Sequence, residues 1–153
     1  VQSMEKDYPE IEVSYEFVDA VAMRLIQWPS SYDVLITSNL FGDILTDEAS
    51  VISGSMGLMP SASIGSENAL YEPIHGSYPE ATGKQIANPI ASILSLSMML
   101  EYSFNLKDES QIINSAVEES LANRYTTPDL SIDNKAFSTK EVGDYIVDFI
   151  KKS

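Results

Sequence analysis

The chain has 153 residues, close to the size of one domain, and 44% of them are apolar, which permits a core and excludes a disordered or low-complexity segment. It contains no cysteine, which excludes disulfide frameworks, thiolate zinc sites and cysteine nucleophiles. Its formal net charge of -14 would repel a phosphate backbone, so we do not expect a nucleic acid partner. The longest apolar stretch, 90–100, is far shorter than the roughly 18 residues of a membrane span, so we expect no membrane segment.

The beginning of the chain predicts a helix end followed by a strand. Val1, Met4 and Tyr8 recur at intervals of three and four, which indicates the last turns of an amphipathic helix before Pro9. Residues 11–18 alternate apolar and polar side chains, the pattern of a half-buried strand. Because the first residue is not Met, we expect further residues, and with them any targeting peptide, to precede it.

The next segments alternate between helix and strand. Asp19 stands at the N-cap position of a predicted helix over 19–28. The apolar run 33–37 is typical of a strand buried on both faces. Residues 42–53 then place apolar side chains at helical spacing. This order predicts an α/β layer architecture.

The second half begins after a segment rich in Gly, Ser and Pro, 53–66, where we place a crossing between domains. Residues 69–74 predict a short strand, and 75–87 a long polar loop. Asn88 precedes a proline and is expected to cap the helix that follows. Three helices complete the chain: one from this cap to about 104, one over 108–125 and one over 138–152.

Asp43 and Asp47 lie four residues apart on a predicted helix, so both carboxylates project from one face. Two like charges at this spacing repel unless a cation lies between them, and Mg²⁺ and Mn²⁺ take oxygen ligands of this kind. Asp19 is a third candidate ligand. The alternative is that Asp43 complements the helix dipole while Asp47, beside Glu48, is merely solvated.

Longer motifs then indicate a family. The segment Asn39 to Ser50, with Gly54 to Leu58, resembles the signature of the isocitrate and isopropylmalate dehydrogenase family. Similarity extends to 17–23 and to the segment from Glu72 to Pro89, and so covers nearly the whole chain. Glu-Pro-Ile-His-Gly-Ser in this last segment is closer to the isopropylmalate branch than to the isocitrate branch. The resemblance implies the α/β fold of that family, which differs from the Rossmann fold, and no Gly-x-Gly-x-x-Gly follows any predicted strand.

The family resemblance also implies a metal site and a homodimer. Asp43 and Asp47 match metal-binding aspartates of one subunit, and Asp19 matches the aspartate that reaches in from the partner subunit. Mg²⁺ or Mn²⁺ held in this way would leave positions for a small 2-hydroxy acid. Helices 19–28 and 42–53 would then pack across the two-fold interface.

The resemblance further implies that NAD lies along the loop after the 69–74 strand. Without the resemblance, a lone histidine in such a loop would favour a surface turn. Glu80 stands where the isopropylmalate branch usually has Asp, and its charge would repel a 2′-phosphate, which favours NAD over NADP. The expected cofactor contacts are Glu72, His75, Gly76, Ser77, Glu80, Ala87, Asn88 and Asp129.

Groups for binding a dicarboxylate substrate are scarce, because Arg24 and Arg124 are the only arginines and both fall within predicted helices. The arginine cluster, lysine and tyrosine of the family have no counterpart here. The chain therefore resembles the C-terminal two-fifths of the enzyme, with 1–53 ending the substrate and dimerisation domain and 54–153 ending the NAD-binding domain.

The resemblance implies that the parent enzyme carries out NAD- and metal-dependent oxidative decarboxylation of 3-isopropylmalate in cytoplasmic leucine biosynthesis. The chain alone is expected to be inactive, since no catalytic residue of the family falls within it. Isocitrate, homoisocitrate and tartrate remain alternative substrates. A non-catalytic acidic ligand-binding module is the alternative from another class, and it predicts a cooperative melt and nucleotide binding by the chain alone.

Overall fold

A computed structural model describes residues 1–133 and 135–153, and its chain divides into two compact units, Val1–Ala49 and Ser50–Ser153. Helix α2, Asn39–Ser53, contains the boundary between them. No helix of the described residues is both long and apolar enough to cross a membrane.

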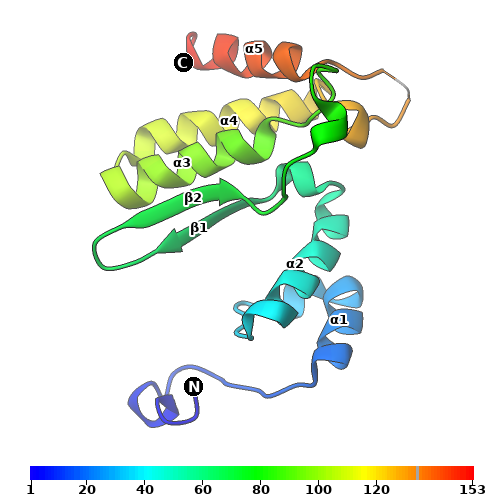
Figure 1. The fold of residues 1–153 in the computed structure, drawn as a ribbon. Helices are drawn as coiled ribbons and strands as arrows, with labels where there is room; N and C mark the ends of the chain where they lie inside the picture. The colour runs from blue at the N-terminus through cyan, green and yellow to red at the C-terminus, as the bar shows by residue number, and fades with distance from the viewer. Residues whose placement is uncertain (134) are drawn as a thin grey trace. The chain divides into compact units, whose positions relative to one another are not determined.

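The first unit contains helix α1, Val18–Gln27, and most of α2 (Figure 1). Its small core consists of Val21 and Leu25 of α1 packed with Leu45 of α2. The helices confirm the two predicted from periodicity. Asp19, however, is not the N-cap: the helix begins one residue earlier, with Phe17 as its cap and Asp19 in the first turn.

Three other predictions for the first unit are wrong. Residues 11–17 form no strand, and 33–37 form none either. A strand is stabilised by hydrogen bonds to a neighbouring strand, and within the described residues neither segment has one. Val34 and Ile36 are accordingly 78% and 75% exposed, although their sequence is that of a buried strand. The predicted helix end before Pro9 is only a 3₁₀ turn over Glu5–Asp7.

The second unit is layered in the order hairpin, α3, α4, α5 (Figure 1). Strands β1, Pro60–Ile64, and β2, Ala69–Pro73, form an antiparallel pair whose register sets Ser61 opposite Glu72. Helix α3, Ile90–Phe104, contacts both strands on one side and α4, Lys107–Ala122, on the other. Helix α5, Thr139–Ile150, covers α4. β2 and the three helices were predicted, whereas β1 was not.

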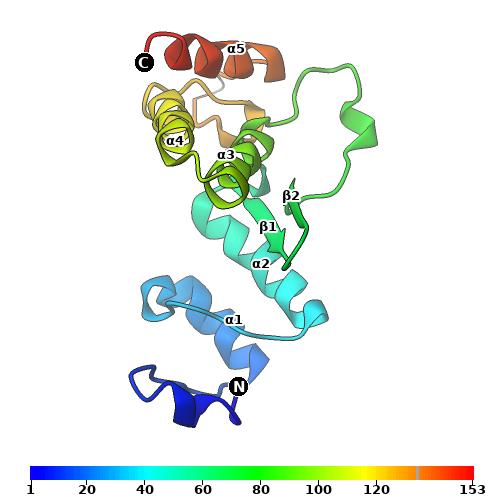
Figure 2. The same ribbon diagram turned by 90° about the vertical axis from the view of Figure 1, so that its left-hand side faces the viewer.

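The core of the second unit lies between these three helices. Its buried side chains are Ile90 of α3, Ala116 and Val117 of α4, and Val142 and Ile146 of α5. Helix α5 begins with a capping box, in which Ser138 and Glu141 satisfy each other's backbone N–H groups. The long segment between β2 and α3 runs out from the hairpin and returns to the start of α3 (Figure 2).

Candidate functional site

The three predicted metal ligands all lie in the first unit and all are exposed. Asp43 and Asp47 lie one turn apart on α2, as their spacing predicts. Asp43 Oδ2 accepts a hydrogen bond of 3.0 Å from Asn39 Nδ2, one turn earlier. Asp19 Oδ1 accepts a bond of 2.9 Å from the backbone N–H of Ala20.

These aspartates do not complete a metal site within one chain. Among the described residues there is no group of three or more His, Cys, Asp or Glu side chains that could hold a metal ion. The donor set nevertheless suits a hard divalent cation, because exposed carboxylate oxygens at one-turn spacing can act as ligands together. Asp43 and Asp47 therefore lie on one face of α2, and Asp19 does not join them in a cluster within the described residues.

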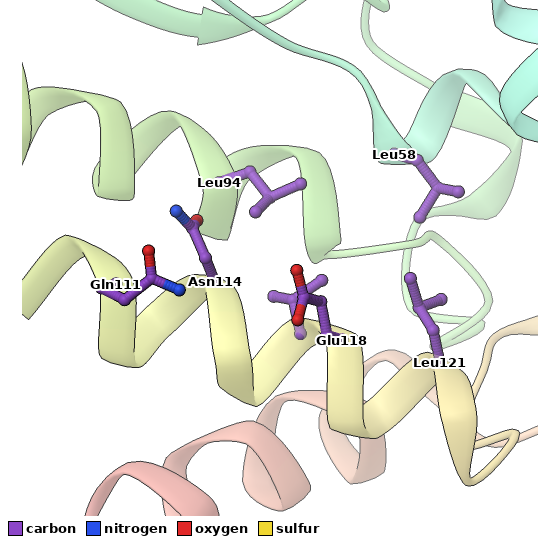
Figure 3. Close-up of a pocket in the computed structure, with 7 residues that line it drawn as sticks. Leu58, Leu94, Gln111, Asn114, Glu118 and Leu121 are labelled. Atoms are coloured by element: carbon purple, nitrogen blue, oxygen red, sulfur yellow. The ribbon is translucent and has the colours of Figure 1, made fainter.

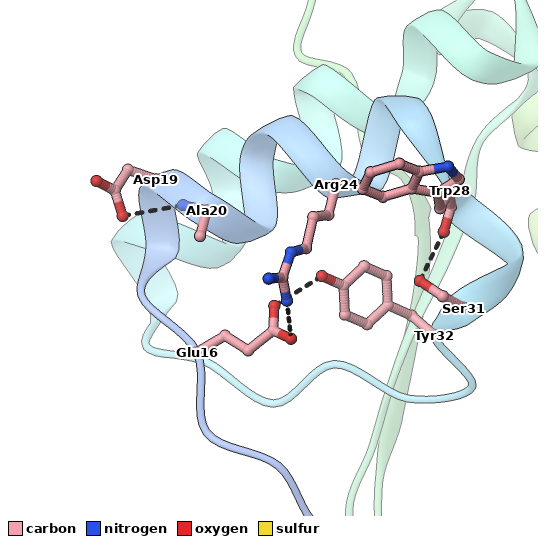
Figure 4. A network of polar contacts seen from close by, with 7 residues as sticks. All are labelled: Glu16, Asp19, Ala20, Arg24, Trp28, Ser31 and Tyr32. Atoms are coloured by element: carbon pink, nitrogen blue, oxygen red, sulfur yellow. Dashed lines mark hydrogen bonds and ion pairs between the residues drawn. The ribbon is translucent and has the colours of Figure 1, made fainter.

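A polar network of the first unit involves one of the two arginines (Figure 4). Arg24 of α1 forms an ion pair of 2.5 Å with Glu16, and the Tyr32 hydroxyl donates a bond of 2.8 Å to the same carboxylate. Partial desolvation and this bond to Glu16 raise the pKa of Tyr32. The other arginine, Arg124, lies in the turn after α4 and not in a helix, 3.7 Å from Asp133. Both arginines thus have acidic partners.

The first five predicted cofactor residues belong to β2 and the loop after it. Glu72, Gly76, Ser77 and Glu80 are exposed, with Glu80 in a 3₁₀ turn over Pro79–Ala81. His75 is partly buried, and its Nδ1 lies 3.0 Å from the carbonyl oxygen of Gly76. An added Cβ at Gly76 would meet no described atom within 4 Å, so the space beside this backbone is open to a ligand.

The other three, Ala87, Asn88 and Asp129, lie where the loop meets α3 and the segment before α5. Asn88 Oδ1 accepts a bond of 3.0 Å from the N–H of Ile90, the first residue of α3, but the N-cap is Pro89 and not Asn88 as predicted. Its Nδ2 donates to Asp129 Oδ2 across 3.0 Å, so the structure brings these two predicted residues together. Ala87 is exposed, and its carbonyl oxygen accepts a bond of 2.6 Å from the Thr139 hydroxyl.

The carboxylate of Asp129 is the centre of a polar network of the second unit. Besides Asn88, it accepts bonds from Ser55 Oγ at 2.5 Å and from Thr127 Oγ1 at 2.6 Å. Desolvation, the largest single influence, raises the pKa of Asp129, but the bonds from Ser55, Thr127 and Asn88 together outweigh it and hold the pKa below its usual value. This carboxylate is therefore ionised near neutral pH and links three separate segments.

Sequence analysis missed the hydroxyl groups that complete this region, Ser55, Thr127 and Thr139. Serine and threonine are common in turns, so their type alone gives no signal, and their partners are distant in sequence. Only Ser55 had a local signal, because a serine directly before a turn is a common capping residue. In the structure its Oγ accepts a bond of 3.0 Å from the N–H of Gly57 and caps the following 3₁₀ turn.

A hollow of about 360 Å³ lies elsewhere in the second unit, between α3, α4 and the turn at Leu58 (Figure 3). No residue predicted to bind metal or cofactor lines it. The lining side chains are Leu58, Leu94, Gln111, Asn114, Val117, Glu118 and Leu121.

Comparison with protein families gives a match over residues 1–146 to the family described as isocitrate/isopropylmalate dehydrogenase. The chain belongs to the isocitrate/isopropylmalate dehydrogenase family. This confirms the family predicted from the motifs at Asn39 to Ser50 and Glu72 to Pro89.

Among the relatives of this family member are two bacterial proteins named 3-isopropylmalate dehydrogenase. That of Bacteroides fragilis is 53% identical over 99% of this chain and 43% of its own length. That of Aquifex aeolicus is 48% identical over 99% of this chain and 42% of its own length. The chain thus spans less than half of the length of these relatives.

Solved structures confirm the family fold. The chain matches an isocitrate dehydrogenase of Methylococcus capsulatus with a TM-score of 0.93 and 39% identity, over 98% of this chain and 44% of that one. It matches a beta-decarboxylating dehydrogenase of Thermococcus kodakarensis with a TM-score of 0.82 and 36% identity, over 99% and 43%. The described helices and the β1–β2 pair are therefore part of the α/β fold of this family.

Proposed function

We propose that the protein containing this chain oxidises and decarboxylates 3-isopropylmalate, with NAD and a divalent cation, as a step of leucine biosynthesis in the cytoplasm. The observation that supports this most strongly is the identity of 53% and 48% to proteins of that name over 99% of the chain. The competing substrate within the family is isocitrate, favoured by the TM-score of 0.93 to an isocitrate dehydrogenase.

The proposed metal ligands are Asp43 and Asp47 of one subunit and Asp19 of its partner in a homodimer. Two observations support a shared site. Asp43 and Asp47 are exposed on one face of α2, and the described residues of a single chain contain no complete cluster of three ligands. The exposed apolar side chains Met23 and Ile26 on α1 and Ile44 and Ile52 on α2 would suit an interface between these helices and their copies.

The proposed NAD site comprises the eight residues of the second unit: Glu72, His75, Gly76, Ser77, Glu80, Ala87, Asn88 and Asp129. Glu72 and Glu80 have exposed carboxylates that can accept hydrogen bonds from ribose hydroxyls, and Glu80 would repel a 2′-phosphate. Asn88 and Asp129 fix the backbone at the start of α3. When bound, the cation polarises the hydroxyl and carboxylate of the substrate and NAD accepts the hydride.

We assign residues 1–53 to the substrate and dimerisation domain of the family and residues 54–153 to its NAD-binding domain. The division of the chain into two compact units after Ala49 supports a domain boundary in this part of the sequence. Because the relatives are more than twice as long, and both arginines here have acidic partners, we expect the 153 residues alone to show no turnover.

Substrate competition tests the proposal. The protein expressed from its own gene is assayed for NADH formation with 3-isopropylmalate, isocitrate, homoisocitrate and tartrate, each with NAD or NADP and with Mg²⁺ or Mn²⁺. We expect the highest kcat/KM with 3-isopropylmalate and NAD. A higher kcat/KM with isocitrate would assign the protein to the other branch, and a preference for NADP would remove the role given to Glu80.

A further inference from the structure

The loop after β2 has little packing of its own. From residue 76 to residue 87 every side chain is exposed except that of Ala81. Its backbone also turns through the left-handed region at Gly83, with φ of +75°, and at Gln85, with φ of +56°. A non-glycine residue with positive φ is uncommon and persists where surrounding contacts determine it. Backbone bonds within the loop join residues from Tyr78 to Lys84, whereas at Gln85 and Ala87 the backbone has contacts from outside the loop.

Two of those contacts come from a single residue, Thr139, at the first position of α5. Its backbone N–H donates a bond of 2.8 Å to the carbonyl oxygen of Gln85. Its hydroxyl donates a bond of 2.6 Å to the carbonyl oxygen of Ala87. The first N–H groups of a helix have no partner within the helix, so this amide is available for a tertiary bond. Thr139 thus bonds the carbonyl groups of two peptide units, Gln85–Ile86 and Ala87–Asn88.

The element that presents Thr139 is itself firmly held. Ser138 and Glu141 form the capping box that defines the start of α5, with the Glu141 carboxylate 2.8 Å from the Ser138 N–H. Val142 and Ile146, on the following turns, are 0% and 1% exposed against α4. The hydroxyl and the N–H of Thr139, in the first turn of this helix, therefore have a defined position, and their hydrogen bonds can order an exposed loop.

We propose that Thr139 is a positioning residue for the cofactor: through its hydroxyl and its amide it orders the backbone at Gln85 and Ala87, and so the approach to Asn88. This inference rests on the proposed NAD site, which includes Ala87 and Asn88. A loop ordered before binding loses less conformational entropy on binding, so the effect of Thr139 belongs to NAD affinity and not to the chemical step.

The test compares Thr139→Val, which keeps the shape and the backbone N–H but removes the hydroxyl, with Thr139→Ser, which keeps the hydroxyl. Both are made in the protein expressed from its own gene. Loss of one net hydrogen bond is expected to raise the Kd and KM for NAD about fivefold in the Val variant, with kcat and the KM for 3-isopropylmalate within about twofold. The Ser variant is expected to restore the wild-type values. Lys140→Ala, which removes an exposed ion pair with Asp144 on the same helix, is the matched control and should change neither.

Each outcome decides between the proposals. If the wild-type protein does not bind NAD, the proposed function fails. If it binds NAD and Thr139→Val binds equally well, or if Thr139→Ser is as weak as Thr139→Val, the role of Thr139 is wrong and the proposed function stands. If Thr139→Val does not fold, Thr139→Ala replaces it. In the Val and the Ala variant alike, we expect amide hydrogen exchange over residues 82–88 to be faster than in the Ser variant.

Discussion

Asn88 and Asp129, which are 41 positions apart in the sequence, are joined by a hydrogen bond of 3.0 Å from Nδ2 to Oδ2. Because Asn88 also accepts a bond from the N–H of Ile90, this bond joins the start of α3 to the 3₁₀ turn over Pro128–Leu130. Ser55, two residues after the end of α2, donates a hydrogen bond to the same carboxylate. The bond thus connects the end of the candidate cofactor loop to the C-terminal segment.

Replacing Asp129 by Asn tests the strength of this network. The amide would turn an NH₂ group toward hydroxyls and an amide that now donate to a carboxylate, so at least one donor would lose its partner. We expect Asp129→Asn to lower the free energy of unfolding by about 1 kcal/mol, less than is usual for a hydrogen bond to a charged group because the residue is partly solvated. Urea denaturation measures the change. Asp133→Asn, which weakens only the exposed pair with Arg124, is the control and is expected to change it by less than about 0.5 kcal/mol.

The effect of Asp129→Asn on the free energy of unfolding is expected to depend on pH. The pKa of Asp129 is lower in the folded protein than its unfolded value of about 3.9, so the unfolded state binds a proton more readily. The stabilisation is therefore fully present above the unfolded pKa and is lost as the pH falls through the folded pKa. We expect the difference in unfolding free energy between wild type and Asp129→Asn to be constant above about pH 5 and to shrink below about pH 4. A difference that grows as the solution is acidified would contradict the assignment.

Gly57 and Gly143 predict opposite effects of one added methyl group. A Cβ at Gly57 would lie 2.6 Å from Cβ of Asn88, too close for any real contact, so Gly57→Ala must displace Asn88. We expect a loss of about 1–3 kcal/mol of unfolding free energy. A Cβ at Gly143, inside α5, meets no described atom within 4 Å, and Gly143→Ala is expected to stabilise the protein by about 0.5–1 kcal/mol. Thermal melts of both variants make the comparison, and a stable Gly57→Ala would place Asn88 elsewhere.

Sequence patterns predicted the helices well, because their signals are local. Apolar spacing identified the five α-helices of the described residues, and the start of α3 was predicted to within two residues from Asn88 and its neighbour Pro89. Strands fared worse, because their partners are remote. β1 consists of Pro, Ser, Ala, Ser and Ile, with no alternation of apolar and polar residues, and it forms by pairing with β2.

The candidate site shows the same contrast between local and distant signals. Asp43 and Asp47 could be placed on one face of α2 from their spacing alone, and the motifs around Glu72 and His75 identified the family. The bonds from Ser55 and Thr127 to Asp129 and from Thr139 to Ala87 had no such signal, because they depend on how segments far apart in the sequence pack together.

Subunit mixing tests most directly the central proposal, a metal site shared between two copies. Asp19→Asn and Asp43→Asn are purified separately, mixed in equal amounts after reversible dissociation, and assayed for NADH formation with 3-isopropylmalate and Mn²⁺. Each variant alone is expected to be nearly inactive. If Asp19 serves the partner's Asp43, every mixed dimer has one intact site, and half of the dimers are mixed, so the mixture should recover about a quarter of the wild-type activity. If mixed dimers form but the mixture is no more active than either variant alone, the shared site is contradicted.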